Sequence, residues 1–586
     1  MPPSPSYLTN LTNLTKPLSL RATIAILILS FSVVAFGQPA WSWPLGIVTA
    51  VCGYACMWRI LLTIPKWCNR FLLGTVWFMA IQCVQLSWFL SHPYLYIYAA
   101  YLLCTLLMGL QWGLLSILIQ PAILSRWLGI FALAGFWTIL EWSRLFWFSG
   151  LPFNPVGLTL TVTIYPLQLA SLAGVYGLSF WVILTNLSVL KIWLTSSTRR
   201  SFAIFISLAL FPYLFGILHF YLHSAALKED ARQVQVVLVQ PGLLPEENLS
   251  FKSAYEARQF VLDEWHQILL PLSSYKYANR QYNNIDPVSL IVFPEYLVPY
   301  GTFYPIFPKA VVQNLFLELF GDVTAAFPLK NALYEQTIMT DRGLDDLVSN
   351  AYFAQTIANI FESHVVLGLQ DTVYIDEAAR QSASYSAAFH FIPNKTITHR
   401  YEKRILVPLG EYIPFEWCRK WAALYGVTGT FNCGTEAKVF DGPVPFSTSI
   451  CYEEIYGNIM RQSRQKGAQL LVNLTNDGWF PNSRLPQQHF DHARLRTIEN
   501  GIPLVRACNT GVTAAVDSFG QIIATLGKDT LKQQTQNGVL AAKIPLYHYH
   551  TLYSQFGDYF ILAIASLFLL LFFIRLLCKL AFFGKN

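Results

Sequence analysis

Long apolar runs alternate with short polar loops over the first 222 residues of this 586-residue chain, and one more apolar run lies near its C-terminus. A bilayer core about 30 Å thick needs roughly 17–25 mostly apolar residues per helix, so each run suits a membrane crossing. The pattern predicts seven membrane helices before the central region and one after it. The expected spans are residues 20–36, 44–64, 71–90, 97–119, 127–148, 166–194, 201–222 and 558–579.

Between residues 230 and 545 the pattern changes to short β-rich runs that alternate with amphipathic helical stretches. Segment 387–401 predicts a β-hairpin that turns at Pro393–Asn394, and a helix that ends at Gly501 precedes two or three further strands. Buried strands are expected at residues 234–240, 289–295, 364–371 and 469–475. Strands alternating with helices predict helices packed on sheets, a class in which reactive groups gather where strands end.

Composition supports this division of the chain. Hydrophobic residues make up 54% and charged residues 12%, against about 25% charged in a typical soluble domain, which argues against a wholly soluble enzyme. Residues 1–222 hold ten Lys and Arg and a single acidic residue, whereas residues 223–557 hold 27 basic and 31 acidic residues. We therefore predict a membrane domain (1–222), a water-soluble domain (223–557), and a final membrane helix with its tail (558–586). The net charge of +7 lies mostly beside membrane runs, which argues against nucleic-acid binding.

Lys and Arg also predict the orientation, because cytoplasmic loops retain positive charge. Loops 37–43, 91–96 and 149–165 contain neither residue, whereas each alternate loop and both ends contain at least one. The charged positions are Lys16, Arg21, Lys66, Arg70, Arg126, Arg199, Arg200, Arg575, Lys579 and Lys585. Both termini are therefore expected in the cytoplasm and residues 223–557 outside it.

The cysteines predict no metal site. Cys52 and Cys56 have helical spacing but no histidine partners, so zinc is not expected there. A disulfide between Cys418 and Cys433 is possible in an oxidising compartment, although nothing in the sequence requires it. No phosphate-binding glycine loop stands out, and no cofactor is expected.

Three residues at predicted strand ends form a candidate reaction centre. Glu295 ends a strand, where partial burial would raise the pKa of a carboxyl group toward that of a general base. Cys451 lies between a strand and a helix expected near "YEEIYG", where a helix N-terminus would stabilise a thiolate. Lys403 precedes an apolar turn. Taken singly, Glu295 is better explained as a strand-end carboxylate in a loop, Cys451 as a small buried side chain and Lys403 as a solvated surface charge.

The order Glu295, Lys403, Cys451 resembles the Glu–Lys–Cys triad of the nitrilase, or carbon–nitrogen hydrolase, superfamily. The contexts "FPE", "YEKRILVPLGEYIP" and "SICYEE" match that superfamily. The first two, with "NLTNDGWF", "NTGVTA" and "LEWSRLFWFSGLPFNPVG", resemble one membrane-bound branch, the bacterial apolipoprotein N-acyltransferases. That branch also has seven helices before the domain and one after it, so the resemblance covers nearly the whole chain.

The resemblance implies a fold and a set of site residues. The fold is a polytopic α-helical membrane protein that carries an extracytoplasmic α/β nitrilase-like domain, an α-β-β-α sandwich. Glu295 matches the general base, Lys403 the lysine that stabilises the intermediate, and Cys451 the nucleophile. The remaining matched positions are Glu411, Tyr452 and Glu453, which support the active site.

The resemblance also implies a function: transfer of an acyl chain from a membrane phospholipid to the N-terminal amine of the diacylglyceryl-cysteine of an apolipoprotein, through a cysteine thioester. The expected location is the bacterial inner membrane, with the catalytic domain on the periplasmic face. Two features depart from the family. The loop 243–251 lacks the family tryptophan, for which Phe251 is a possible substitute, and segment 301–350 is long.

Two alternatives remain open from the residues. One is a membrane-tethered amidase or nitrilase-type hydrolase with water as the acceptor. The other is a transporter or structural membrane protein, for which Glu141, Arg144 and Arg59 are the candidate intramembrane charges. Trp479 and Phe480 suit either contact with acyl chains or packing within the domain.

Overall fold

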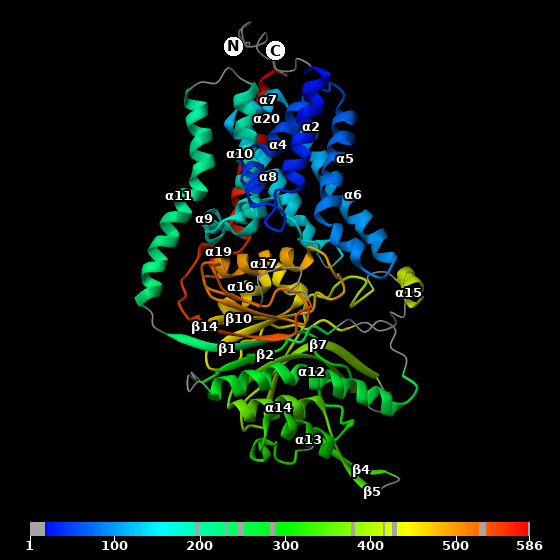
Figure 1. Cartoon of the computed structure of the whole chain (residues 1–586). Coiled ribbons are helices and arrows are strands. Elements are labelled where there is room, and N and C mark those ends of the chain that lie inside the picture. The colour runs from blue at the N-terminus through cyan, green and yellow to red at the C-terminus, as the bar shows by residue number, and fades with distance from the viewer. Residues whose placement is uncertain are drawn as a thin grey trace. The chain divides into compact units, whose positions relative to one another are not determined.

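The structure is a computed structural model, and it describes residues 18–148, 150–194, 199–229, 232–243, 251–281, 287–331, 333–340, 343–376, 381–413, 416–424, 431–526 and 535–583. The chain divides into two compact units (Figure 1). The first comprises Met1–Ala225 and His550–Asn586, and the second comprises Ala226–Tyr549. Two segments far apart in the sequence thus belong to one unit.

The first unit is helical. Its longer helices are α2 (Leu20–Ala35), α4 (Tyr54–Leu61), α5 (Trp67–Gln85), α6 (Tyr96–Leu118), α8 (Trp127–Trp142), α10 (Ala170–Leu194), α11 (Arg199–Glu229) and α20 (Tyr559–Phe583). Shorter pieces are α3 (Trp43–Val48), α7 (Pro121–Leu124), α9 (Ile164–Leu167) and α19 (Leu552–Phe556).

Several of these helices are compatible with membrane spans. Within the described ranges, five are long and apolar enough: Trp43–Leu61, Tyr96–Leu118, Ala170–Leu194, Arg199–Lys228 and Tyr559–Lys579. The helices α2 and α8 have 16 residues each, below the roughly 17–25 that span a bilayer without local thinning. The expected number of eight spans therefore stays a prediction.

The buried charges of the first unit have structural partners. Glu141 accepts a hydrogen bond from the Val156 backbone N–H at 2.8 Å, and Arg144 donates from Nε to Gln111 Oε1 at 2.8 Å. Arg144 Nη1 also lies 3.9 Å from Glu141 Oε1. These contacts hold together the helix end at Trp142 and the segment near Val156, so the two charges have a structural explanation without a transport path.

The second unit is a four-layer sandwich in which two sheets lie between helices (Figure 1). The six-stranded sheet has the order β14 (Gly538–Pro545), β1 (Gln233–Gln240), β2 (Leu290–Val292), β6 (His364–Asp376), β7 (Gln381–Phe391), β8 (Thr398–Glu402). The five-stranded sheet has the order β13 (Ile522–Thr525), β12 (Ala514–Val516), β11 (Leu504–Cys508), β10 (Leu470–Thr475), β9 (Phe446–Ile450). The outer helices are α12 (Ala254–Gln281) and α14 (Asn350–Phe361) on one side, and α16 (Gly457–Gln465) and α17 (Leu485–Asn500) on the other.

The predicted strands are confirmed at the centre of each sheet. Strands β1, β2 and β6 are parallel, as are β9, β10 and β11, and β7 with β8 forms the expected antiparallel hairpin. Asn394 takes the left-handed conformation that its turn requires, with φ of 57°. Segment 502–526 supplies three strands, at the upper end of the prediction.

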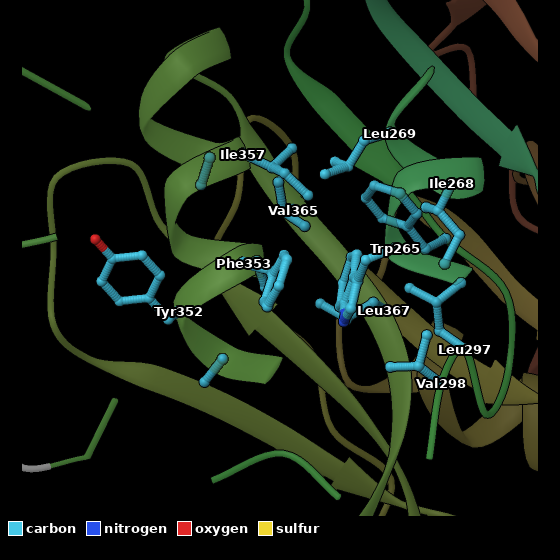
Figure 2. Close-up of a cluster of buried hydrophobic side chains, with 14 of the residues drawn as sticks. Trp265, Ile268, Leu269, Leu297, Val298, Tyr352, Phe353, Ile357, Val365 and Leu367 are labelled. Carbon is cyan, nitrogen blue, oxygen red and sulfur yellow. The ribbon is translucent and has the colours of Figure 1, made fainter. Parts of the chain in front are cut away.

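Side-chain alternation along β1 divides the hydrophobic core in two. Val236 and Leu238 pack between the two sheets, whereas Val237 and Val239 face the helix layer. In that outer core Trp265 of α12 stacks on Phe353 of α14, with ring centroids 4.5 Å apart (Figure 2). The two cores hold both sheets rigidly, and the loops at the strand ends therefore have a fixed base.

The long segment 301–350 forms an addition to the sandwich. Helix α13 (Lys309–Phe320) lies beside a three-stranded antiparallel sheet of order β3 (Phe307–Pro308), β5 (Gly343–Val348), β4 (Glu335–Thr340). Its apolar side chains, Phe307, Phe316 and Val348 among them, join the outer core. The loop expected to hold the family tryptophan lies at 244–250, outside the described residues, and Phe251 beside it packs against Phe260 with centroids 5.5 Å apart.

Candidate active site

Glu295 lies three residues beyond β2, where the backbone continues to pair with β6. Phe293 N–H donates to the Val366 carbonyl at 2.8 Å, and Leu297 N–H donates to the Gly368 carbonyl at 2.9 Å. Gly368 permits this approach, because a Cβ there would lie 2.6 Å from the Glu295 Cα. The Glu295 side chain is buried rather than half-buried, and its position is set by backbone on both sides.

Lys403 follows β8 and is fully buried. Its backbone N–H donates to the Ser386 carbonyl of β7 at 2.8 Å, which fixes the start of the turn. Its Nζ donates to Glu295 Oε1 at 2.8 Å and to Glu411 Oε1 at 2.6 Å. Glu411 in turn accepts a bond from Val407 N–H at 2.9 Å. One ammonium therefore bridges two carboxylates that lie 116 positions apart in the sequence.

Cys451 follows β9 directly and has the left-handed backbone conformation, with φ of 48°. For a residue with a Cβ this conformation is uncommon, and it is typical of strained functional turns. The Cys451 thiol interacts with the Glu295 carboxylate, and this interaction opposes the rise of the Glu295 pKa. The structure thus brings Glu295, Lys403 and Cys451 together in one place, with Glu295 in contact with both partners.

The expected helix N-terminus at Cys451 is wrong. Cys451 begins a single turn of 3₁₀ helix, Cys451–Ile455, and α16 starts only at Gly457. One short turn supplies no long helix dipole. Burial, followed by the charge of Glu295, instead raises the pKa of the Cys451 thiol well above its usual value, while Lys403 opposes the rise. The side chain of Cys451 is therefore a protonated thiol that needs a base, and not a preformed thiolate.

The electrostatics of the other two groups fit that need. Burial raises the pKa of Glu295, although Lys403 opposes the shift. Burial by itself lowers the pKa of Lys403, but the charges of Glu295 and Glu411 outweigh burial and hold that pKa well above its usual value. The lysine is therefore a permanent cation beside a carboxyl group whose raised pKa suits proton exchange.

Glu453 ties the Lys403 segment to the Cys451 segment. Its carboxylate is fully buried and accepts from Arg404 N–H at 2.6 Å, Ile450 N–H at 2.8 Å and the Tyr401 hydroxyl at 2.9 Å. Three short bonds to two separate segments fix their spacing. Burial raises the pKa of Glu453 while these bonds oppose the rise.

The other sequence candidates have ordinary surroundings. The Tyr452 ring lies edge-on to Tyr456, with centroids 5.4 Å apart. Trp479 and Phe480 are partly buried within their loop. Cys508 is fully buried, and burial raises the pKa of its thiol.

The possible disulfide is not formed. Cys418 and Cys433 are both free cysteines, and Cys433 is exposed. Among the described cysteines, none that lies in the candidate site is linked in a disulfide.

Sequence reasoning missed a cluster of buried charged residues beside Cys451. We call Glu454, Asp477, His489 and Arg506 the buried quartet, because none of the four side chains is more than 3% exposed. One signal was available in the sequence. Arg506 lies within the apolar run "LVRAC", and a charge in a buried strand requires a buried partner.

The described residues contain one group at metal-binding spacing. The potential ligand atoms of Cys451, Asp477 and His489 lie within 4.8 Å of one another. Asp477 and His489 are already paired with each other at 2.9 Å, and Asp477 also pairs with Arg506. We therefore assign this group to the protein's own ion pairs and not to a metal.

Two family models match the chain. The model described as "Carbon-nitrogen hydrolase" matches residues 253–549, and the one described as "Apolipoprotein N-acyltransferase N-terminal domain" matches residues 25–188. The first covers the second unit with its candidate site, and the second lies within the helical unit.

Relatives match over nearly the full length. The apolipoprotein N-acyltransferase of Chlamydia pneumoniae is 32% identical, over 92% of this chain and 94% of its own. That of Chlamydia caviae is 31% identical, over 90% and 93%. Among solved structures, Nit3 of Saccharomyces cerevisiae, a nitrilase-superfamily member, shares 15% identity with a TM-score of 0.31, over 55% of this chain and 93% of that one.

Proposed function

The chain belongs to the apolipoprotein N-acyltransferase family, and we propose that its activity, the N-acylation of lipoproteins, proceeds through Glu295, Lys403 and Cys451. This proposal rests on one observation, the contacts that the Glu295 carboxylate makes. The Glu295 carboxylate accepts a hydrogen bond from the Lys403 ammonium at 2.8 Å and also interacts with the Cys451 thiol. A base, a nucleophile and a cation in mutual contact are what covalent acyl transfer requires.

In the first half-reaction, Glu295 takes the thiol proton and the Cys451 sulfur attacks the ester carbonyl of a phospholipid. The tetrahedral oxyanion is stabilised by Lys403 and by backbone N–H groups at the turn. When the C–O bond breaks, Glu295 returns the proton to the departing alcohol oxygen. The products are an acyl-Cys451 thioester and a lysophospholipid.

In the second half-reaction, the N-terminal amine of a diacylglyceryl apolipoprotein attacks the thioester carbonyl. Glu295 takes the proton from nitrogen, Lys403 stabilises the second oxyanion, and the proton returns to the sulfur as the C–S bond breaks. The result is an amide and the free Cys451 thiol. Glu411 serves by holding Lys403, and Glu453 by fixing the spacing of the two segments.

The test is intact-mass spectrometry of the full chain with a defined phospholipid and no acceptor. Wild type is expected to gain one acyl mass on Cys451, and a diacylglyceryl lipopeptide added afterwards should remove it. Cys451→Ser and Glu295→Gln should gain none while retaining the folded state. An active wild-type enzyme that never carries the adduct would contradict the covalent route.

We propose that the protein resides in the bacterial inner membrane, with eight spans and the catalytic unit on the periplasmic face. The support is the alternation of Lys and Arg among the loops. A reporter fused after residue 230 should be active only if exported, and one fused after residue 586 only in the cytoplasm. The reverse result for either fusion would overturn this orientation.

The hydrolase alternative is not favoured. The relatives that match over more than nine-tenths of the chain are named as acyltransferases, and the helical unit matches a domain of that same family. An amidase would also have no need for the apolar helices, whereas two lipid substrates reside in the bilayer. If the protein released free fatty acid and transferred no acyl chain to a lipopeptide, the hydrolase alternative would be favoured again.

A further inference from the structure

The buried quartet is a closed set of two anions and two cations. His489 Nδ1 lies 2.9 Å from Asp477 Oδ1, and its Nε2 lies 3.0 Å from Glu454 Oε1. Arg506 pairs with the same two carboxylates, at 2.8 Å to Glu454 and 3.2 Å to Asp477. Isolated buried charges are costly, so the set is favourable only when the positive and negative charges balance. Balance requires a protonated His489.

The imidazole geometry agrees with a cation. Each ring nitrogen lies within 3.0 Å of a carboxylate oxygen, and a carboxylate accepts but does not donate, so a ring protonated on both nitrogens satisfies both carboxylates. Arg506 Nη2 lies 3.0 Å from Nδ1, and both point to Asp477. Burial favours a neutral ring, yet the charges of Glu454 and Asp477 outweigh burial and raise the pKa of His489 to about 9.

The quartet reaches the nucleophile through a backbone bond. His489 Nε2 also lies 3.2 Å from the Cys451 carbonyl oxygen, so its N–H is shared between that oxygen and Glu454. Cys451 has the uncommon left-handed φ of 48°, which persists only where surrounding contacts determine it. A cation on this carbonyl also polarises the Cys451–Tyr452 peptide, which makes the Tyr452 N–H a stronger donor toward an oxyanion.

We propose that His489 is a positioning residue for the nucleophile: as a cation it neutralises Glu454 and Asp477 and holds the Cys451 carbonyl, so that the thiol stays directed at Glu295. The inference rests on the proposed role of Cys451 as nucleophile. Nothing in the triad itself requires a histidine. Helix α17, which carries His489, lies in the layer outside the five-stranded sheet, whose strand β9 ends just before Cys451.

The direction in which removal of the His489 cation changes the pKa values of the site follows from the charges. The potential ligand atoms of Asp477 and Cys451 lie within 4.8 Å, so an unbalanced carboxylate would disfavour negative charge on the sulfur and on Glu295. Both pKa values would rise, and the rate of acylation at neutral pH would fall. At an effective dielectric of about 20, one such charge within 4.8 Å displaces a pH profile by about two to three units.

The experiment measures the rate of acyl-Cys451 formation by the full chain in detergent with a defined phospholipid, from about pH 6 to about pH 10. We expect His489→Gln, which can still donate to the carbonyl, to be about tenfold or more slower near pH 7, with its profile displaced to higher pH. The phospholipid concentration at half-maximal rate should not change. His492→Gln is the matched control, since His492 is equally buried on the same helix.

A second variant tests the charge argument with the opposite sign. Asp477→Asn removes a negative charge near the sulfur and leaves Glu454 facing both His489 and Arg506, so its profile should move to lower pH. If His489→Gln does not fold, this displacement decides the proposal. Three results would overturn the proposal. They are a shift of the Asp477→Asn profile to higher pH, a His489→Gln profile that does not shift, and a loss of acylation rate in His492→Gln equal to that in His489→Gln. Cys451→Ser, which should form no adduct in the same assay, tests the proposed nucleophile separately.

Discussion

Replacement of Lys403 by methionine tests the central interaction of the site. Methionine keeps the length of the side chain but removes the ammonium that lies 2.8 Å from Glu295 and 2.6 Å from Glu411. Two effects are expected, and they can be measured separately. The oxyanion loses a charged donor, and two buried carboxylates lose the cation between them.

The first effect lowers the limiting rate. If Lys403 equals one oxyanion-hole donor, acylation should fall by about 10²–10³-fold at every pH. The second effect moves the pH profile. Because both carboxylates contact one ammonium, they lie no more than about 5.4 Å apart, and at an effective dielectric of 20 their repulsion is about 3 kcal/mol. That energy corresponds to about two pH units.

The direction follows from the role of Glu295 as a base. Burial already raises the Glu295 pKa, and Lys403 opposes that rise. A base acts above its pKa, so activity falls as pH falls through that value. Without Lys403 the pKa rises further, and the loss of activity on the acid side should begin about two units higher.

The assay is the initial rate of acyl-Cys451 formation across pH, read by intact mass. Lys395→Met is the control, because Lys395 is an exposed lysine near the turn of the same β7–β8 hairpin. A variant that reached the wild-type rate at high pH would refute the oxyanion role of Lys403. A lower plateau with an unmoved acid side would refute its coupling to Glu295.

Three further substitutions test the surroundings of the site. Glu453→Gln places an amide N–H₂ against a backbone N–H, so we expect a loss of about 1–3 kcal/mol in the free energy of unfolding, measured by denaturant titration, and slower acylation. Gly368→Ala should displace Glu295, because the new Cβ would lie 2.6 Å from its Cα; we expect about 1–3 kcal/mol of destabilisation and a reduced adduct rate, and a wild-type rate would contradict the assigned contact. Cys508→Ala should retain acyl transfer to a lipopeptide, since that thiol is buried and its pKa is raised; inactivity of this variant with an active Cys451→Ala would reverse the choice of nucleophile.

Periodicity and residue order in the sequence determined the general organisation. The nearly continuous apolar run at residues 234–240 indicates a strand buried on both faces, and the structure places its side chains in two cores. The apolar runs predicted the helical unit, and the order Glu295, Lys403, Cys451 in its local contexts indicated the family. These features are local, so a linear pattern carries them directly.

Tertiary structure alone decided which charges meet. Glu295 and Lys403 are 108 positions apart, and periodicity contains no information on whether one ammonium bridges Glu295 and Glu411. The 3₁₀ turn after Cys451 replaced the expected helix because Glu453 is held by backbone N–H groups from the Lys403 segment, a long-range contact. His489 looked like one more polar position on a helix. Its role depends on Asp477, Glu454 and Arg506, which packing brings together from three other segments, and burial makes their charges interdependent.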